Sequence, residues 1–328
     1  MTTYKEIFGK YVKNYSSDPT ADIEGQIWYN TTSGTFKSNV LVAAAWAAGG
    51  NLGTARNALA GAGTQTAGLA ISGAPGLPGP NATSSTEEYD GSSWTAGGNI
   101  TNAAIGPFGF GTQTAAVGAG GYGNPNANLT TTEEYDGSTW SPSGAMASAR
   151  NRGASAGIQT AGLAFGGNPV PTRGTATEEY DGSAWTTGGA LSTGRRALAG
   201  CGTQTAGLAF GGDQDPPITG ATEEYNGSTW TAGGTMNTAI GAQAGSGIQT
   251  AALSFGGQLA PGANTGLSEA YDGTSWVSAP TMGTARRALG GAGTQTSGLG
   301  FGGFTTASVT TTEEFTSGTT AVKTITTS

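Results

Sequence analysis

A repeat of about 45 residues is the feature that most constrains the fold of this chain. Six tryptophans recur 45 to 48 residues apart, and they are Trp46, Trp94, Trp140, Trp185, Trp230 and Trp276. The last five of these are each preceded, five residues earlier, by a tyrosine: Tyr89, Tyr135, Tyr180, Tyr225 and Tyr271. A period of this length with Gly-Gly, Tyr and Trp marks is typical of a radial array of small β-sheets, and not of a helical solenoid.

Each repeat predicts four short strands, which we call a, b, c and d. In the fourth repeat, strand a is ALAGCG, strand b is AGLAFGG, strand c is TEEYNG and strand d surrounds the next Trp. Repeat length varies only between the Gly-Gly and the Glu-Glu, so insertions are confined to the b–c loops. Because antiparallel strands alternate in direction, the b–c loops and the d–a links lie on one face. Variable loops on a fixed scaffold are typical of a recognition surface.

The strand count predicts how the array closes. Six copies of strands a, b and c follow Trp46, but only five Trp-bearing strands come after them. We therefore expect the strand around Trp46 to pair with the last c strand, near Thr312 to Phe315, so that no edge is left unpaired. The C-terminal AVKTITTS is also β-prone and competes for that place. The match of WAAGG to the repeat favours Trp46.

Composition narrows the possible functions. The net charge of −8, with 13 basic residues, argues against nucleic acid as a partner, because phosphate binding requires a cationic surface. No run of 18 apolar residues occurs, so we expect no membrane span. The chain has no histidine, which is the commonest general base and metal ligand. We expect no enzymatic activity, no cofactor and no metal.

The residues that recur in every copy are interpreted as structural. We expect the Trp and Tyr side chains to pack between sheets, and carbohydrate stacking is the alternative. One Glu of each Glu-Glu pair is expected to form an ion pair with an arginine of a neighbouring copy. Adjacent strand residues point to opposite faces, so the two carboxylates do not converge as a glycosidase requires. The arginines expected in these ion pairs are Arg56, Arg150, Arg195 and Arg286.

The Gly-Thr-Gln-Thr turns between strands a and b also recur. For their glutamines the sequence predicts either solvated side chains or a repetitive docking surface.

Five residues in the b–c loops are candidates for ligand contact. They are Tyr122, Leu129, Arg173, Leu259 and Phe304. Large apolar and charged side chains in such loops serve either as contact residues or as partly packed anchors of the loop. The sequence leaves both interpretations open.

The Gly-Gly, Tyr and Trp pattern, with an arginine ten residues after a Trp, resembles the Kelch repeat over residues 46–315. The second and fifth copies depart from it with Ala104 and Ile240 at the arginine position, and the first has Ser72-Gly73 for Gly-Gly. Kelch repeats build β-propellers of four-stranded blades. The resemblance therefore implies an all-β fold: a six-bladed Kelch-like β-propeller over residues 39–328, preceded by an N-terminal arm and β-hairpin in residues 1–38.

Two recurring segments, TEEYDGSTW and AGAGTQTAGLAFGG, are similar to segments of Kelch-like structural proteins of marine tailed phages, notably phages that infect cyanobacteria. The start, YKEIFGKYVKNYSSDPTADIEGQIWYN, is similar to a segment found on assorted virion proteins of those phages. The resemblance implies a non-enzymatic virion structural or adhesion protein on the particle surface, at the tail or the head exterior. Its arm would bind other virion proteins, its b–c loops a host surface glycan or protein, and a homo-oligomer stays open. The alternatives are a capsid decoration or neck protein without host binding, and a sugar-active propeller enzyme.

Overall fold

The computed structural model describes residues 12–19, 26–76, 81–123, 126–169, 173–214 and 217–325. The described residues form β-strands, turns and loops and contain no helix, as the all-β prediction requires. The chain divides into two compact units. We call Trp46–Thr316 the repeat unit, and Met1–Ala45 with Ser317–Ser328 the terminal unit.

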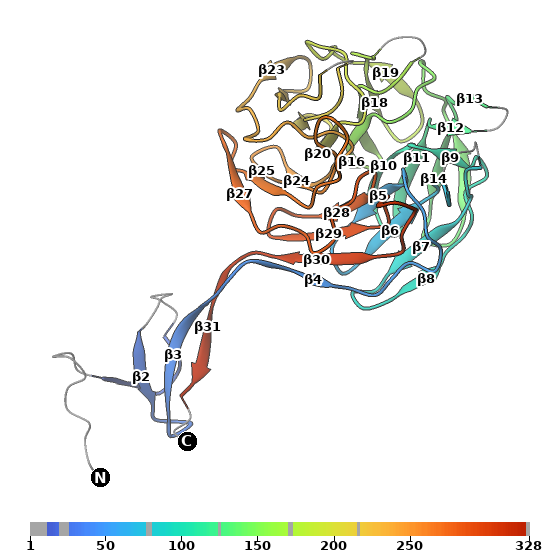
Figure 1. Ribbon diagram of the computed structural model, residues 1–328. Coiled ribbons are helices and arrows are strands. Elements are labelled where there is room, and N and C mark those ends of the chain that lie inside the picture. The colour runs from blue at the N-terminus through green and yellow to red at the C-terminus, as the bar shows by residue number, and fades with distance from the viewer. Residues whose placement is uncertain are drawn as a thin grey trace. The chain divides into compact units, whose positions relative to one another are not determined.

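The repeat unit consists of four-stranded antiparallel sheets, and each contains strands a, b, c and d in that order (Figure 1). The first three are β5 (Ala60–Gly63), β6 (Gly68–Ile71), β7 (Thr86–Tyr89) and β8 (Trp94–Ala96); β10 (Phe108–Thr112), β11 (Ala115–Ala119), β14 (Thr132–Tyr135) and β15 (Trp140–Ser143); and β16 (Ala154–Ile158), β17 (Ala161–Phe165), β18 (Thr177–Tyr180) and β19 (Trp185–Thr187).

The next sheets are β20 (Ala199–Gly202), β21 (Gly207–Phe210), β22 (Thr222–Tyr225) and β23 (Trp230–Ala232); β24 (Ala244–Ile248), β25 (Ala251–Phe255), β26 (Ser268–Tyr271) and β27 (Trp276–Ala279); and β28 (Gly290–Gly293), β29 (Ser297–Phe301), β30 (Thr312–Thr316) and β4 (Ala45–Ala48). A small three-stranded sheet lies in the second repeat and contains β9 (Ala104–Ile105), β12 (Tyr122–Gly123) and β13 (Ala127–Asn128). This repeated arrangement of four-stranded sheets is consistent with a β-propeller.

The strand around Trp46 completes the last sheet, as predicted. Blue β4 lies beside red β30 in Figure 1, and the Gly49 N–H donates to the Thr312 carbonyl at 3.0 Å. The Trp46 ring packs against Phe315 of β30, with centroids 5.3 Å apart. The competing C-terminal strand lies elsewhere, in the terminal unit.

The terminal unit is a sheet of β1 (Lys13–Tyr15), β2 (Ile27–Asn30), β3 (Thr35–Val42) and β31 (Thr319–Thr324). β2 and β3 form the predicted hairpin. The predicted boundary at residues 38 and 39 differs from the division in the structure, because β3 runs on to Val42 and pairs along that length with β31. That pairing also places residues 317–328 here, whereas we had assigned them to the repeat unit. Residues 1–11 and 20–25 of the predicted arm and hairpin lie outside the described residues.

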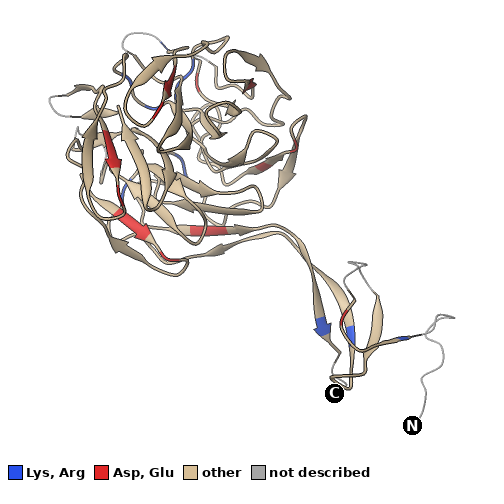
Figure 2. Ribbon diagram, turned by 180° about the vertical axis from the view of Figure 1, so that it is seen from behind, with Lys and Arg blue, Asp and Glu red and all other residues tan. Residues whose placement is uncertain are grey.

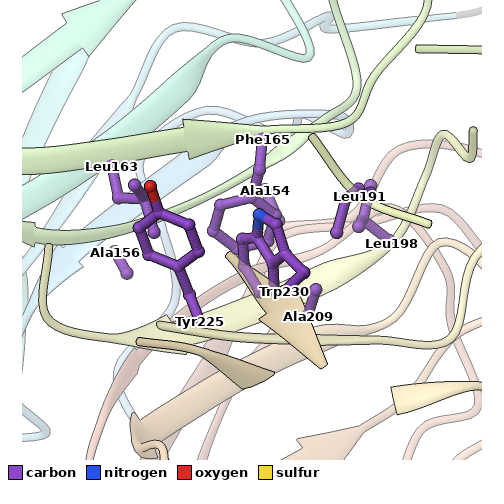
Figure 3. Close-up of a cluster of buried hydrophobic side chains, with 9 residues drawn as sticks. All are labelled: Ala154, Ala156, Leu163, Phe165, Leu191, Leu198, Ala209, Tyr225 and Trp230. Atoms are coloured by element: carbon purple, nitrogen blue, oxygen red, sulfur yellow. The ribbon is translucent and has the colours of Figure 1, made fainter. Parts of the chain in front are cut away.

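The core lies between adjacent sheets. Figure 3 shows one interface, where Trp230 of the fourth sheet contacts Phe165 of the third, with ring centroids 4.8 Å apart. Tyr225 packs beside Trp230 and is fully buried. Since the strands are rich in glycine and alanine, these large aromatic rings fill the space between the sheets and remove apolar area from water there. The same pairing joins the sixth sheet to the first, where Trp94 contacts Phe301 at 4.9 Å.

Side-chain hydrogen bonds cross each interface in the same way. The Trp indole donates to a hydroxyl on strand c of the preceding sheet at 2.9–3.2 Å, in the pairs Trp46–Ser268, Trp94–Thr312, Trp140–Thr86, Trp185–Thr132, Trp230–Thr177 and Trp276–Thr222. The Tyr hydroxyl donates to the second Glu of the preceding sheet, in the pairs Tyr89–Glu314, Tyr135–Glu88, Tyr180–Glu134, Tyr225–Glu179 and Tyr271–Glu224. The last sheet is thereby bonded to the first.

We had predicted that the six glutamines of the a–b turns are solvated or form a docking surface. The first of these predictions is wrong for their Nε2 groups, which bond to the preceding sheet. Gln204 donates from Nε2 to the Gly162 and Tyr180 carbonyls of the preceding sheet at 3.2 and 2.8 Å. Gln65 bonds in the same way to Gly298 and Phe315 of the sixth sheet. A long amide side chain beside a neighbouring strand finds backbone acceptors there, so these residues connect sheets.

In four of the five Glu-Glu pairs the first Glu is buried beside an arginine, and Figure 2 colours both charges. In the second copy, which has Ala104 at the arginine position, Glu133 instead accepts from the Thr101 and Asn102 backbone N–H groups. The ion pairs are Arg56–Glu87 at 3.0 Å, Arg150–Glu178 at 3.1 Å, Arg195–Glu223 at 2.8 Å and Arg286–Glu313 at 3.2 Å. Both partners belong to the same repeat, so the predicted pairing with a neighbouring copy is wrong. The reason is that the backbone of the arginine is bonded to the preceding sheet, as where the Arg195 N–H donates to the Gly174 carbonyl, while its side chain extends to strand c of the next sheet, which belongs to its own repeat.

Candidate ligand-binding cavity

A ring of backbone hydrogen bonds surrounds the centre of the repeat unit. It joins one residue from each repeat, twelve positions after the Trp: Ala58, Gly106, Arg152, Ala197, Ala242 and Ala288. Each N–H donates to the carbonyl of the preceding member, and Ala58 donates to Ala288, at 2.6–2.8 Å. All six have φ between +48° and +61°, although five are not glycine. Such a conformation costs about 1–3 kcal/mol for a non-glycine residue, so the ring bonds must offset it.

A cavity of about 460 Å³ opens at this ring. Its wall combines ring residues with the d–a links and with the b–c loop residues Asp213, Gln258 and Phe304. The cavity therefore lies on the face where we had predicted recognition. Its volume is within the range of pockets that hold small ligands.

The wall of the cavity is cationic. Arg152, Arg196 and Arg287 line it, each from a different repeat. Desolvation by the surrounding protein atoms and the nearby charges of Arg196 and Arg287 lower the pKa of Arg152, although the residue is exposed at the cavity. The Arg152 guanidinium is thus repelled by the other two. Asp213 is the one carboxylate among the described lining residues. The cavity is thus positive in a chain whose net charge is −8.

The existing partners of these arginines leave one of them uncommitted. Arg196 donates from Nε to Asp213 at 3.0 Å. Arg287 donates to Asn264 Oδ1 at 3.0 Å, and its guanidinium lies over the Phe304 ring at 4.8 Å. The Arg152 side chain is exposed, and among the described residues it makes no hydrogen bond or ion pair. Its guanidinium donors are therefore all available to a ligand, whereas Arg196 and Arg287 each donate one of theirs within the protein.

A buried amide also lines the cavity. Gln243 is 6% exposed and donates from Nε2 to the Phe210 carbonyl at 3.1 Å. Its Oε1 is buried and has no hydrogen-bond partner among the described residues. An unpaired buried acceptor is costly, and such groups in native proteins call for an explanation. Because Gln243 lines the cavity, a ligand donor can pair with this oxygen once the side chain turns toward it.

The five b–c loop candidates are all half-buried. Tyr122 packs on Ala58, Ala74 and Ile105, and Leu259 packs on the core of the fourth and fifth sheets. These placements favour loop anchors, and the same holds for Leu129, which lies against Gly123. Phe304 lines the cavity. Arg173 is not among the described lining residues, but it donates to the lining residue Asp213 at 3.3 Å.

The sequence analysis missed the three cavity arginines. We had assigned roles to Arg150, Arg195 and Arg286, but not to the arginine one or two residues later. The sequence does mark these three arginines as unusual. Eleven and twelve residues after the Trp, the other copies have Asn, Ile, Gly or Ala, so an arginine at either position departs from the repeat. The fold then brings these departures together at one cavity.

In comparisons with known proteins, no family model matches the chain and no curated protein matches it significantly. No helix in the described part of the chain is long and apolar enough to cross a membrane. Within the same residues, no three His, Cys, Asp or Glu side chains are grouped as metal ligands are. Cys201 is buried, and burial raises the pKa of its thiol to about 12.

Proposed function

We propose that the repeat unit is a six-bladed Kelch-like β-propeller closed by the strand around Trp46. Each of the six sheets that carry the repeat is one blade. The support is threefold: the last sheet contains β4, the first and last sheets share the Trp94–Thr312 and Tyr89–Glu314 bonds, and the backbone ring has one member per repeat.

We propose that this propeller is a non-enzymatic virion structural or adhesion protein. It is displayed on the particle surface, at the tail or a fibre, and binds a host surface glycan or protein through the b–c loop face. One observation supports the binding role: arginines that differ from the residues of most other copies gather at the cavity. The interfaces between sheets, in contrast, have the same residues in almost every copy. The virion assignment rests on the resemblance of the repeat and of the chain's start to phage structural proteins.

The glutamates that recur in the repeats are bonded to other groups of the protein, which supports the non-enzymatic part of the proposal. The first Glu of a pair is held by an arginine or by backbone N–H groups, as where Glu223 Oε2 accepts from Ser192 N at 2.8 Å. The second Glu accepts from a buried tyrosine. General acid–base chemistry needs a carboxyl group within reach of a substrate, and these groups are committed to the fold.

Electron microscopy of purified particles labelled with gold-conjugated antibody against residues 46–316 tests the location. We expect label at the tail tip or fibres, and pre-adsorbing the serum with the recombinant protein should remove it. Label confined to the head or neck would favour decoration or assembly instead, and the absence of label from intact and disrupted particles would refute the virion assignment. A second test adds the recombinant protein to host cells before infection, where an adhesion protein should reduce phage adsorption.

A further inference from the structure

We propose that the central cavity binds the anionic group of an acidic saccharide, a carboxylate or a sulfate. This deepens the proposed adhesion role by naming the class of ligand for the b–c face. The residues concerned all line the cavity, so the same ligand class is expected whether the saccharide lies on a particle or on a cell.

The first step is charge. Arg152, Arg196 and Arg287 face one cavity, and Asp213 is the one described carboxylate in its wall. Asp213 is already shared by Arg173 and Arg196. Holding three guanidinium groups together is unfavourable in the empty protein, and an anion that enters relieves the repulsion. The planar fork of Arg donors matches the oxygens of carboxylate and sulfate.

The second step is the uncharged part of the ligand. Gln243 Oε1 is a buried acceptor without a partner, and it needs a hydroxyl or N–H donor. The amide of Gln258 stands at the same wall. Inorganic sulfate carries no donor for these groups, whereas a sugar carries several hydroxyls beside its acidic group. The combination of guanidinium and amide groups therefore favours a hydroxylated anion.

The third step is that the two key residues are not required for the fold. At the position of Arg152, four other copies have alanine, and at the position of Gln243, three have leucine: Leu59, Leu198 and Leu289. The ring bonds at Arg152 involve only its backbone. Arg152→Ala and Gln243→Leu hence restore residues that the repeat already accommodates, and both variants should fold.

Isothermal titration calorimetry on the purified full chain tests the proposal. The probes are an oligogalacturonate, a sulfated galactan oligosaccharide, an uncharged galactan oligosaccharide of equal length, and inorganic sulfate. We expect at least one acidic saccharide to bind, the uncharged one not to bind, and affinity to fall with added salt. The preference between the first two probes identifies the anionic group as carboxylate or sulfate.

Arg152→Ala should weaken acidic-saccharide binding about 10- to 100-fold, which corresponds to the loss of hydrogen bonds to a charged group. Lys323→Ala is the matched control, because it removes the same charge from the terminal unit and should leave binding unchanged. Gln243→Leu should weaken saccharide binding but not the binding of sulfate.

Equal binding of charged and uncharged saccharides, an unchanged affinity in Arg152→Ala, or no binding of either acidic probe at millimolar concentration would overturn the proposal. Inorganic sulfate that binds as tightly as the saccharides would overturn its saccharide part. These results do not depend on where the protein sits on a particle. If no acidic saccharide binds but antibody labels the tail, the adhesion role still holds and the cavity proposal is refuted. If an acidic saccharide binds but no particle is labelled, the cavity proposal still holds and the virion assignment is refuted.

Discussion

The hydrogen bond from Tyr225 to Glu179 offers the sharpest test of how the sheets are held together. Tyr225 is fully buried, donates to Glu179 Oε1 at 2.6 Å, and accepts from the Gly189 N–H at 3.3 Å. Tyr225→Phe keeps the ring and its contact with Trp230 but leaves the carboxylate and the N–H without this partner. A bond to a charged group contributes about 1.5–3 kcal/mol, so we expect the free energy of unfolding to fall by that amount.

The chain itself contains one interface without this bond. At the equivalent positions between the fifth and sixth sheets, Ala270 replaces the glutamate, Phe315 replaces the tyrosine, and Pro280, which has no N–H, replaces the glycine. Acceptor, hydroxyl and donor are all lost together there. This pattern indicates that an orphaned polar group costs more than the absence of the whole set.

The double variant Glu179→Ala/Tyr225→Phe should consequently be more stable than the sum of the two single variants predicts, with a coupling of about 0.5–3 kcal/mol. Urea unfolding followed by tryptophan fluorescence measures all four proteins of the cycle. Tyr122→Phe is the control, because Tyr122 is half-buried in the same unit and its hydroxyl has no hydrogen bond among the described residues. A Tyr225→Phe effect no larger than that of the control, or strictly additive costs in the cycle, would refute the reasoning.

Three further predictions concern stability. Arg195→Met should cost about 3–5 kcal/mol in urea unfolding, since it leaves Glu223 buried without its cation, and a change below about 0.5 kcal/mol would contradict the buried pair. Deleting residues 1–50 removes β4 and should abolish a soluble, cooperatively melting product, whereas deleting residues 1–43 together with 318–328 should preserve one, as size-exclusion chromatography and calorimetry will show. The melting temperature should fall between pH 10 and 12. Burial raises the pKa of Tyr89 and its four equivalents to about 12 in the folded protein, so over this range the unfolded chain loses these phenol protons first and is favoured. An unchanged melting temperature across that range would contradict this prediction.

The period of the repeat predicted much of the fold. The Trp and Tyr spacing indicated the four strands of each sheet, the b–c position of the insertions, and the role of Trp46 in the last sheet. These features depend on local alternation and on counting, which one sequence contains. The YDGSxW segments form turns between strands c and d, as Asp and Gly favour, and there Asp136 accepts backbone hydrogen bonds from Thr139 and Ser138 that lower the pKa of its carboxyl group.

The errors concern partners that are distant in sequence. Gln204 reaches carbonyls of the preceding sheet, and Arg195 pairs within its own repeat, because the approach of one segment to another decides which acceptor lies near a long side chain. The pairing of β31 with β3 was missed for the same reason. AVKTITTS is β-prone, but strand propensity does not identify the edge to which a strand binds.

The cavity arginines show why a binding site can differ between copies without disturbing closure. The ring that joins the repeats uses only backbone N–H and C=O groups, so Ala197, Gly106 and Arg152 form the same two bonds with different side chains. The Trp, Tyr and Gln side chains that join the sheets have no such freedom, because each one is itself the donor. Stability therefore depends on residues that repeat, and recognition can vary at the ring with little loss of free energy. If this division is correct, Arg152→Ala should weaken anion binding about 10- to 100-fold. The free energy of unfolding should stay the same or rise slightly, since a charge that Arg196 and Arg287 repel is removed.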